Sequence, residues 1–143
     1  IVDPKGTNWM KYAGADYITP NLKEINAVPP DPIRNEDAPV EQAAHDVMKR
    51  FHLGSIIVTR SEAGLSLICE GEIKHIPTKA QEVFDVSGAG DTVIAVFAMG
   101  IAGGIAPVAS AYLANLAAGV VVAKLGTYAV SREELLKALE KEK

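Results

Sequence analysis

Features of secreted, membrane-bound and nucleic-acid-binding proteins are scarce in this sequence. Its one cysteine, Cys69, cannot form an internal disulfide, so the fold does not depend on an oxidising compartment. Basic residues are too few for a general nucleic-acid binder, because 14 Lys and Arg face 18 Asp and Glu and the formal net charge is −4. No basic region followed by an apolar run and a small-residue cleavage site opens the chain, so we expect no signal peptide.

Charge is missing altogether from one long stretch, Thr92 to Ala123. A single membrane-spanning helix needs about 20 continuous apolar residues. Here Gly103, Gly104 and Pro107 interrupt the stretch near its middle, which favours two buried helices joined by a Gly/Pro turn. We therefore expect no membrane span and no membrane partner.

Hydrophobic residues make up 48% of the 143 residues, which is enough to bury a core in a single domain. Apolar β-branched runs alternate with helical patterns along the chain. The expected strands lie near 1–2, 16–19, 55–59, 65–69 and 73–76, and the expected helices near 7–13, from 21, and near 40–51, 88–100, 107–124 and from 131. The strands at 65–69 and 73–76 flank Glu70-Gly71-Glu72, which predicts a hairpin. The alternation as a whole predicts an α/β fold with a mainly parallel sheet flanked by helices.

The segment from Asp85 to Thr92, DVSGAGDT, carries the sharpest chemical signal. Its two glycines precede an apolar helix, and such a turn exposes successive backbone N–H groups. These amides and the helix dipole favour an anion, such as a phosphoryl group in transfer. A carboxylate at Asp91 beside this anion fits a general base for a hydroxyl nucleophile. The alternative, from the residues alone, is a Gly-rich helix start with Asp91 as a first-turn acid.

This segment resembles the signature of the ribokinase-like, phosphofructokinase-B type sugar kinases, although Val86 stands where Thr is usual. Further segments resemble the family in the same order along the chain: Asp3–Thr7, Thr19–Glu24, Val58–Gly64, Pro77–Val83 and Ala117–Thr127. Together they resemble, within this family, the kinases of ADP-heptose synthesis, which phosphorylate D-glycero-β-D-manno-heptose 7-phosphate at its anomeric hydroxyl. The resemblance implies that residues 1–143 are the C-terminal part of a ribokinase-like kinase domain, with most of the sugar site outside them.

The resemblance also implies roles in the Gly-rich turn. Asp91 would remove the proton from the sugar hydroxyl. The backbone N–H groups of Gly88, Ala89 and Gly90 would form the anion hole for the γ-phosphoryl group.

Asn21 and Glu24 match the family's Asn-x-x-Glu motif. The resemblance implies that they organise Mg²⁺ and the nucleotide phosphates, with Glu24 reaching the ion through water, and Mg²⁺ does prefer oxygen ligands and keeps much of its water shell. The residues alone predict a helix cap instead, because Asn21 stands at an N-cap position with Glu24 three residues later.

Four more residues are nucleotide candidates by the same resemblance. Thr59, Ser61 and Gly64 follow a buried strand and match the segment that meets the nucleotide phosphates and ribose, although ribokinases often have Gly where Ser61 stands. Asn115 lies in an apolar helix that matches the adenine-side wall of the pocket. The alternative for Asn115 is a hydrogen bond within the core.

Several other polar residues suggest less specific roles. Lys5 and Arg60 could face an anionic group, but a surface position is the commoner explanation for both. The three histidines, His45, His52 and His75, have no metal-binding spacing, and Cys69 is expected to be a small core residue.

The resemblance implies ATP, Mg²⁺ and a monovalent cation whose ligands we do not assign. It also implies a sugar phosphate as the acceptor and a cytoplasmic location. An exposed sheet edge, at which further strands would pair, favours a homo-oligomer. Two alternatives stay open, namely another ribokinase-like sugar kinase with a different acceptor, and a non-catalytic nucleotide-binding fragment that lacks the sugar-binding half.

Overall fold

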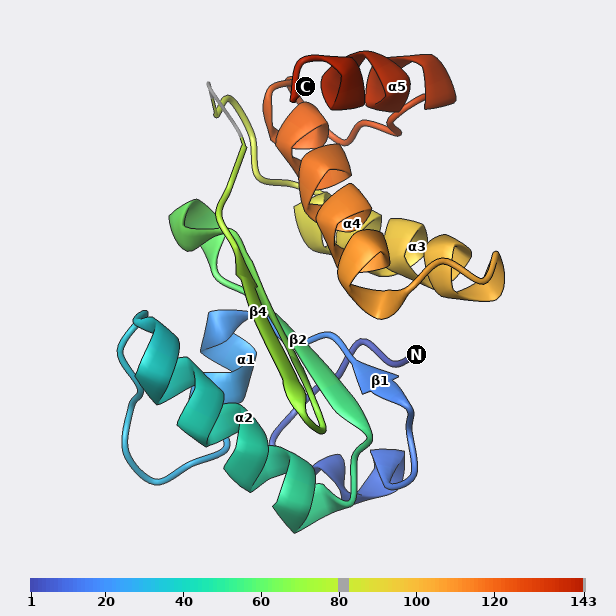
Figure 1. Ribbon diagram of the computed structural model, residues 1–143. Helices are drawn as coiled ribbons and strands as arrows, with labels where there is room; N and C mark the ends of the chain where they lie inside the picture. Colours follow the sequence, from blue (N-terminus) through green and yellow to red (C-terminus); the bar gives the residue numbers. More distant parts are fainter. Residues whose placement is uncertain (80–82, 143) are drawn as a thin grey trace. The chain divides into compact units, whose positions relative to one another are not determined.

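The computed structural model describes residues 1–79 and 83–142, which fall into two compact units, Ile1–Pro77 and Thr78–Lys143 (Figure 1). Each unit is described by itself. The first unit contains the elements η1 (Trp9–Tyr12), β1 (Tyr17–Ile18), α1 (Leu22–Asn26), α2 (Asp37–Phe51), β2 (Ser55–Thr59), η2 (Ser61–Ala63), β3 (Leu65–Cys69) and β4 (Glu72–Ile76). The second unit contains α3 (Ala89–Ala102), α4 (Pro107–Val122) and α5 (Arg132–Glu140). Part of the Pro77–Val83 segment singled out in the sequence lies outside the described residues.

The sheet of the first unit has the strand order β1-β2-β3-β4. β1 and β2 run parallel, and isolated parallel bridges join Val2 to Ile18 and Asn21 to Thr59. The expected hairpin is present, so β3 and β4 add two antiparallel pairings. The sheet is therefore mixed in this part of the fold, because a tight hairpin can only join antiparallel neighbours.

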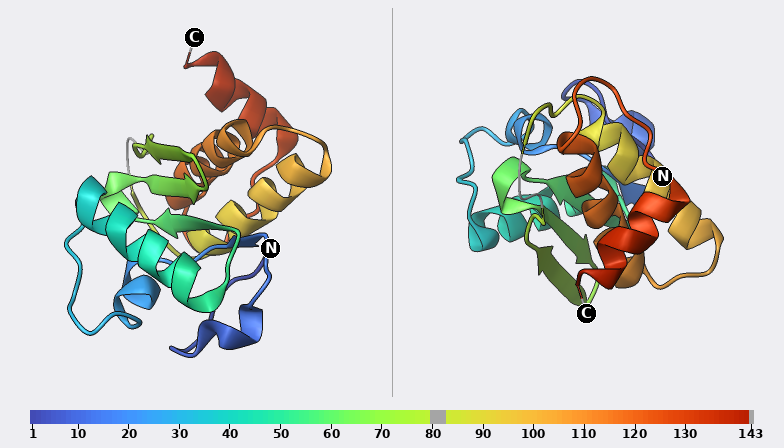
Figure 2. Two further views of the ribbon diagram at one scale, coloured as in Figure 1. Left: turned by 60° about the horizontal axis from the view of Figure 1, so that its bottom comes forward. Right: turned by 90° about the horizontal axis from the view of Figure 1, so that it is seen from above.

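The core of the first unit lies between one face of the sheet and the helices. Figures 1 and 2 show α1 and α2 on the same face. Val40, Val47 and Phe51 of α2 are buried there against Ile56 and further strand residues, as their helical spacing predicts. β2 is buried along both faces, which its continuous apolar run also predicts.

One boundary of α2 differs from the sequence-based expectation. The helix begins at Asp37 rather than near Val40, because the acidic Asp37 and Pro39 both suit the first turn of a helix. It ends at Phe51 as expected, and the next residue, His52, adopts the left-handed conformation at φ 54° and donates its N–H to the carbonyl of Met48.

The second unit is a helical hairpin, α3 and α4, with α5 packed against α4. Gly100 of α3 permits the closest approach, because a Cβ placed there would lie 2.5 Å from Oγ and 2.8 Å from Cβ of the buried Ser110 in α4. The predicted Gly/Pro break is present between α3 and α4. Within residues 1–79 and 83–142, no helix combines the length and the apolar character that crossing a bilayer requires.

Candidate active site

The Gly-rich turn forms an open N-terminus on α3. Gly88 is the N-cap residue and has φ 79° and ψ 0°, a left-handed conformation that glycine adopts without a steric penalty. Thr92 donates from both its backbone N–H and its Oγ1 to the carbonyl of Gly88, each at 2.9 Å. The amides of Gly90 and Asp91 therefore precede the first hydrogen bond of the helical ladder, where backbone donors are available to a ligand. The N–H of Ala89, by contrast, donates to the carbonyl of Val86 at 3.2 Å.

Asp91 lies in the first turn of α3 with an exposed side chain. Gly90 borders open space, since a Cβ built there would meet no described atom within 4 Å. No described atom therefore covers Gly90, and the neighbouring Asp91 side chain is exposed. A carboxylate in this position is also favourable to the helix dipole, so the structural reading of Asp91 and the catalytic one are compatible.

Asp85 anchors the turn to the end of α4, a function that the sequence analysis missed. One carboxylate oxygen accepts the N–H of Ser87 at 2.8 Å and the other accepts the N–H of Gly126 at 3.1 Å. The amides of Phe84 and Asp85 both donate to the carbonyl of Val122. Hydrogen bonds from the Ser87 side chain and backbone, and then from Gly126, hold the pKa of Asp85 below its usual value.

Asn115, the adenine-side candidate, is buried in α4 of the same unit. The structure therefore puts Gly88, Ala89, Gly90, Asp91 and Asn115 into the second unit, on the two helices of one hairpin. The other site candidates belong to the first unit.

In the first unit, the candidates cluster where β1 and β2 end. Asn21 directly follows the strand region of β1 and bridges to Thr59, the last residue of β2. The Thr59 N–H donates to the carbonyl of Pro20 at 3.0 Å. This is the carboxyl edge of a parallel strand pair, where α/β proteins commonly bind ligands.

Asn21 and Glu24 form the capping box that their spacing predicts. The Asn21 side chain accepts the Glu24 N–H, and Glu24 Oε2 accepts the Asn21 N–H, each at 2.8 Å. Glu24 Oε1 also pairs with Lys5 Nζ at 2.8 Å, and Lys5 pairs with Asp3 at 3.0 Å. The hydrogen bonds to Glu24 and then Asp3 raise the pKa of Lys5.

Lys5 is exposed, as expected, but it forms an ion pair with Glu24 of the Asn-x-x-Glu motif. Its ammonium lies beside the carboxylate that the family resemblance assigns to Mg²⁺ and phosphate. Its link to this carboxylate was not evident from the sequence, because the two residues are 19 positions apart.

The turn between β2 and β3 holds the remaining nucleotide candidates. Ser61 has φ 52°, which is uncommon for a residue with a side chain, and Gly64 has φ 83°. The positive φ of Ser61 gives a physical reason why glycine suits this position in ribokinases. The N–H of Arg60 donates to the carbonyl of Gly64 at 2.7 Å and closes the turn.

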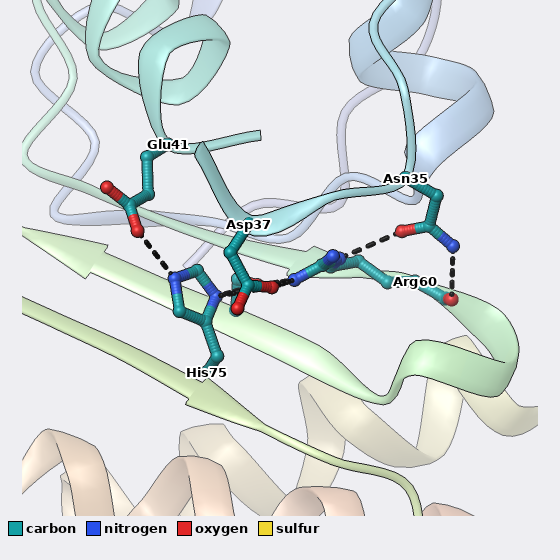
Figure 3. A network of polar contacts seen from close by, with 6 residues as sticks. Asn35, Asp37, Glu41, Arg60 and His75 are labelled. Atoms are coloured by element: carbon teal, nitrogen blue, oxygen red, sulfur yellow. Dashed lines mark hydrogen bonds and ion pairs between the residues drawn. The ribbon is translucent and has the colours of Figure 1, made fainter. Parts of the chain in front are cut away.

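The expectation that Arg60 is a surface residue is wrong. Its side chain is 3% exposed and lies among polar groups of the first unit (Figure 3). Its guanidinium donates to Asp37 at 2.6 Å and to Ser66 at 2.9 Å. The hydrogen bond from Arg60 to the Asp37 carboxylate lowers the pKa of Asp37. Burial was not predictable from an arginine placed after a strand, because its partners are distant in sequence.

His75 and Cys69 both lie in strands of the hairpin, and Cys69 is half-buried rather than a core residue as expected. His75 Nε2 lies 2.7 Å from Glu41 Oε1, and Cys69 is the last residue of β3. Across the described ranges 1–79 and 83–142, no cluster of three or more His, Cys, Asp or Glu side chains could hold a metal ion.

A single carboxylate can still serve Mg²⁺ when substrate phosphates and water complete the octahedron. Glu24 supplies two oxygen donors, and each already accepts one hydrogen bond within the protein. Contact through water fits this carboxylate better than direct ligation.

Comparison with known proteins places these features in a family. The profile of the pfkB family of carbohydrate kinases matches residues 1–134. The bifunctional protein HldE of Trichlorobacter lovleyi is 51% identical over 143 residues, and that of Acidiphilium cryptum is 46% identical over 141 residues. These alignments cover 99% and 98% of this chain but 29% of each relative, so the chain spans less than a third of the length of these curated relatives.

Solved structures give the same result for the fold. The ribokinase of Thermotoga maritima superposes with a TM-score of 0.76 at 29% identity, covering 87% of this chain and 42% of that one. The Arabidopsis thaliana ribokinase complexed with ribose and ATP gives 0.79 at 26% identity, covering 87% and 41%. The ribokinase-like fold is confirmed, and the chain belongs to the pfkB family of carbohydrate kinases.

Proposed function

We propose that this chain supplies the nucleotide site, the anion hole and the general base of an ATP-dependent sugar kinase. The proposed acceptor is D-glycero-β-D-manno-heptose 7-phosphate, which would become the 1,7-bisphosphate. The observation that carries the proposal is the turn at Gly88–Gly90, in which the amide of Gly90 precedes the hydrogen-bond ladder of α3 and lies next to Asp91, whose side chain is exposed. Membership of the pfkB family supports the sugar kinase class. The ordered motifs described above support the heptose acceptor.

In this mechanism, Asp91 accepts the proton of the sugar's anomeric hydroxyl. The resulting oxygen attacks the γ-phosphorus of ATP in line, the bond to the β-phosphate oxygen breaks, and ADP leaves. The amides of Gly88, Ala89 and Gly90 stabilise the negative charge on the transferring group. The N–H of Ala89 would exchange its hydrogen bond to the Val86 carbonyl for one to the phosphoryl group.

The first-unit residues Asn21, Glu24, Thr59, Ser61 and Gly64 would contact the nucleotide, and Asn115 of the second unit would contact its base. Glu24 would hold Mg²⁺ through water, and the bound ion would neutralise charge on the phosphates. Lys5 would keep Glu24 in place through their 2.8 Å ion pair.

A cytoplasmic location and self-association belong to the same proposal. A cytoplasmic location follows from the use of ATP and a sugar phosphate. Self-association would use the sheet edge at Val2, which pairs with the outer side of β1, since the opposite edge strand, β4, carries the exposed charges of Glu72 and Lys74, which discourage edge pairing.

The decisive experiment inserts this chain in place of the matching segment of the Trichlorobacter lovleyi relative and assays phosphoryl transfer from ATP to heptose 7-phosphate. We expect turnover, and we expect Asp91→Asn to reduce kcat by a factor of about 10² to 10⁴. Asp31→Asn, which neutralises an exposed loop carboxylate, is the matched control and should leave kcat unchanged.

Other outcomes separate the alternatives. Near-normal kcat in Asp91→Asn would remove the general base from the proposal. Turnover of another sugar phosphate, but not of heptose 7-phosphate, would identify a different acceptor. Nucleotide binding without any turnover would favour a non-catalytic nucleotide-binding chain.

A further inference from the structure

A buried arginine lies directly beside the nucleotide candidates of the first unit. Arg60 stands between Thr59 and Ser61, and its side chain is 3% exposed. Removing a charged group from water is unfavourable unless the group is paired and hydrogen-bonded. The hydrogen-bond partners of Arg60 therefore decide how its charge is stabilised next to this turn.

Those partners come from four separate segments. The guanidinium of Arg60 donates to Asn35 Oδ1 at 2.9 Å, to Asp37 Oδ1 at 2.6 Å and to Ser66 Oγ at 2.9 Å. His75 of β4 extends the network, with Nδ1 2.7 Å from Ser66 Oγ (Figure 3). Arg60 is thereby held to the loop before α2, to α2 and to the hairpin strands β3 and β4.

Asn35 contacts Arg60 at two points. Its carboxamide oxygen accepts the Arg60 Nε–H, and its amide nitrogen donates to the backbone carbonyl of Arg60 at 3.2 Å. One side-chain amide therefore fixes the guanidinium and the peptide group of the same residue relative to each other. The orientation of the Arg60 backbone is set by the network rather than by the turn alone.

The Arg60 backbone in turn closes the turn that carries the nucleotide candidates. Its N–H donates to the Gly64 carbonyl at 2.7 Å, and its carbonyl accepts the Ala63 N–H at 3.1 Å. Ser61 within this turn has φ 52°, a conformation that costs a non-glycine residue free energy and persists where surrounding contacts impose it. The two hydrogen bonds of the Arg60 backbone are such contacts.

We propose that Arg60 is a positioning residue for nucleotide binding. Through Asn35 and its own backbone, it holds the Thr59–Gly64 turn in the conformation that receives the phosphates of a nucleoside triphosphate. Direct contact with phosphate is not its function, because its side chain is 3% exposed, its Nε and Nη1 donate to Asn35, Asp37 and Ser66, and its charge is balanced by Asp37. This inference rests on the proposed function, in that the turn must bind nucleotide.

Calorimetric titration of the full 143-residue chain with Mg·ATP tests the proposal. Arg60→Lys keeps the charge, but an ammonium cannot donate to Asn35, Asp37 and Ser66 in the geometry of a guanidinium. We expect the Kd for Mg·ATP to rise by about tenfold or more, because the turn loses its preorganisation. Asn35→Asp keeps an acceptor for Arg60 Nε but removes the donor to the Arg60 carbonyl. It should raise the Kd to a similar extent, and since Asn35 is only half-buried, this second variant remains informative if Arg60→Lys does not fold.

A merely structural role of Arg60 would give a different result. Partial unfolding lowers the number of binding sites per chain but leaves the Kd of the folded fraction unchanged. Glu41→Gln is the matched control within the same network, because Glu41 joins it through His75 at 2.7 Å and retains a polar group there. We expect its Kd to stay within about twofold of the unsubstituted chain.

The outcomes are distinguishable from those that test the proposed function. If the unsubstituted chain does not bind Mg·ATP, the proposed function fails at its nucleotide site. If it binds, while both Arg60→Lys and Asn35→Asp leave the Kd unchanged, the positioning role is overturned. An equal rise of Kd in Glu41→Gln would also overturn it, since the effect would then be a general loosening of the network.

Discussion

At the scale of single residues, Gly88 and Gly90 have different structural requirements although they are two positions apart. Gly88 needs φ 79°, whereas Gly90 lies in the first helical turn and faces open space. We expect Gly88→Ala to lower the free energy of unfolding by about 1–2 kcal/mol, the cost of a left-handed conformation for an L-residue. Gly90→Ala should leave it unchanged or raise it, because alanine favours a helix. Chemical denaturation of both variants is the measurement, and equal losses would contradict this account of the turn.

Glu134 gives a pH dependence at the same scale. Hydrogen bonds from the Ser131 backbone and then from the Tyr128 hydroxyl lower its pKa from 4.5 to about 2. Because the folded-state pKa is depressed, its contribution to stability is fully present above about pH 4.5 and is lost as the pH falls towards 2. Urea midpoints of the unsubstituted chain and of Glu134→Gln should therefore differ more at pH 7 than at pH 2.5. A constant difference across this range would contradict the assignment.

At the scale of elements, the pairing of α3 and α4 depends on one close approach. A Cβ at Gly100 would lie 2.5 Å from Ser110 Oγ, so Gly100→Ala should destabilise the chain by about 1–3 kcal/mol through overpacking. Removing the opposing side chain with Ser110→Gly should relieve part of this loss. The double variant, measured by denaturation, is then expected to be more stable than the sum of the single changes predicts. Strict additivity would show that the two positions do not contact.

At the scale of the whole molecule, the candidate nucleotide residues are distributed over both compact units. If the chain binds nucleotide, Mg·ATP at 100 times its Kd should stabilise the chain by about 2.7 kcal/mol and raise its Tm. Amide hydrogen exchange should slow in the Thr59–Gly64 turn and in the Gly88–Thr92 segment alike. Asp91→Asn should keep both effects, because the proposed general base is not required for nucleotide binding. Unchanged exchange in both segments would contradict nucleotide binding at these residues.

Much of this protein could be predicted from short stretches of sequence, because the interactions concerned are local. The capping box at Asn21 depends on residues three positions apart, and it is present. The break between α3 and α4 follows from glycine and proline backbone preferences, and the hairpin from turn residues between two apolar runs. The Gly-rich turn before α3 is likewise a property of successive residues.

Tertiary structure alone decided which distant side chains meet. The burial of Arg60 requires partners at positions 35, 37, 66 and 75, and the anchor of the Gly-rich turn joins Asp85 to Gly126 across 41 positions. The tie between Lys5 and Glu24 has the same origin. No periodicity records such pairings, since they depend on how the strands and helices pack together. The sequence by itself therefore determined most of the elements and the candidate catalytic motif, and packing determined which distant residues contact that motif and the nucleotide candidates.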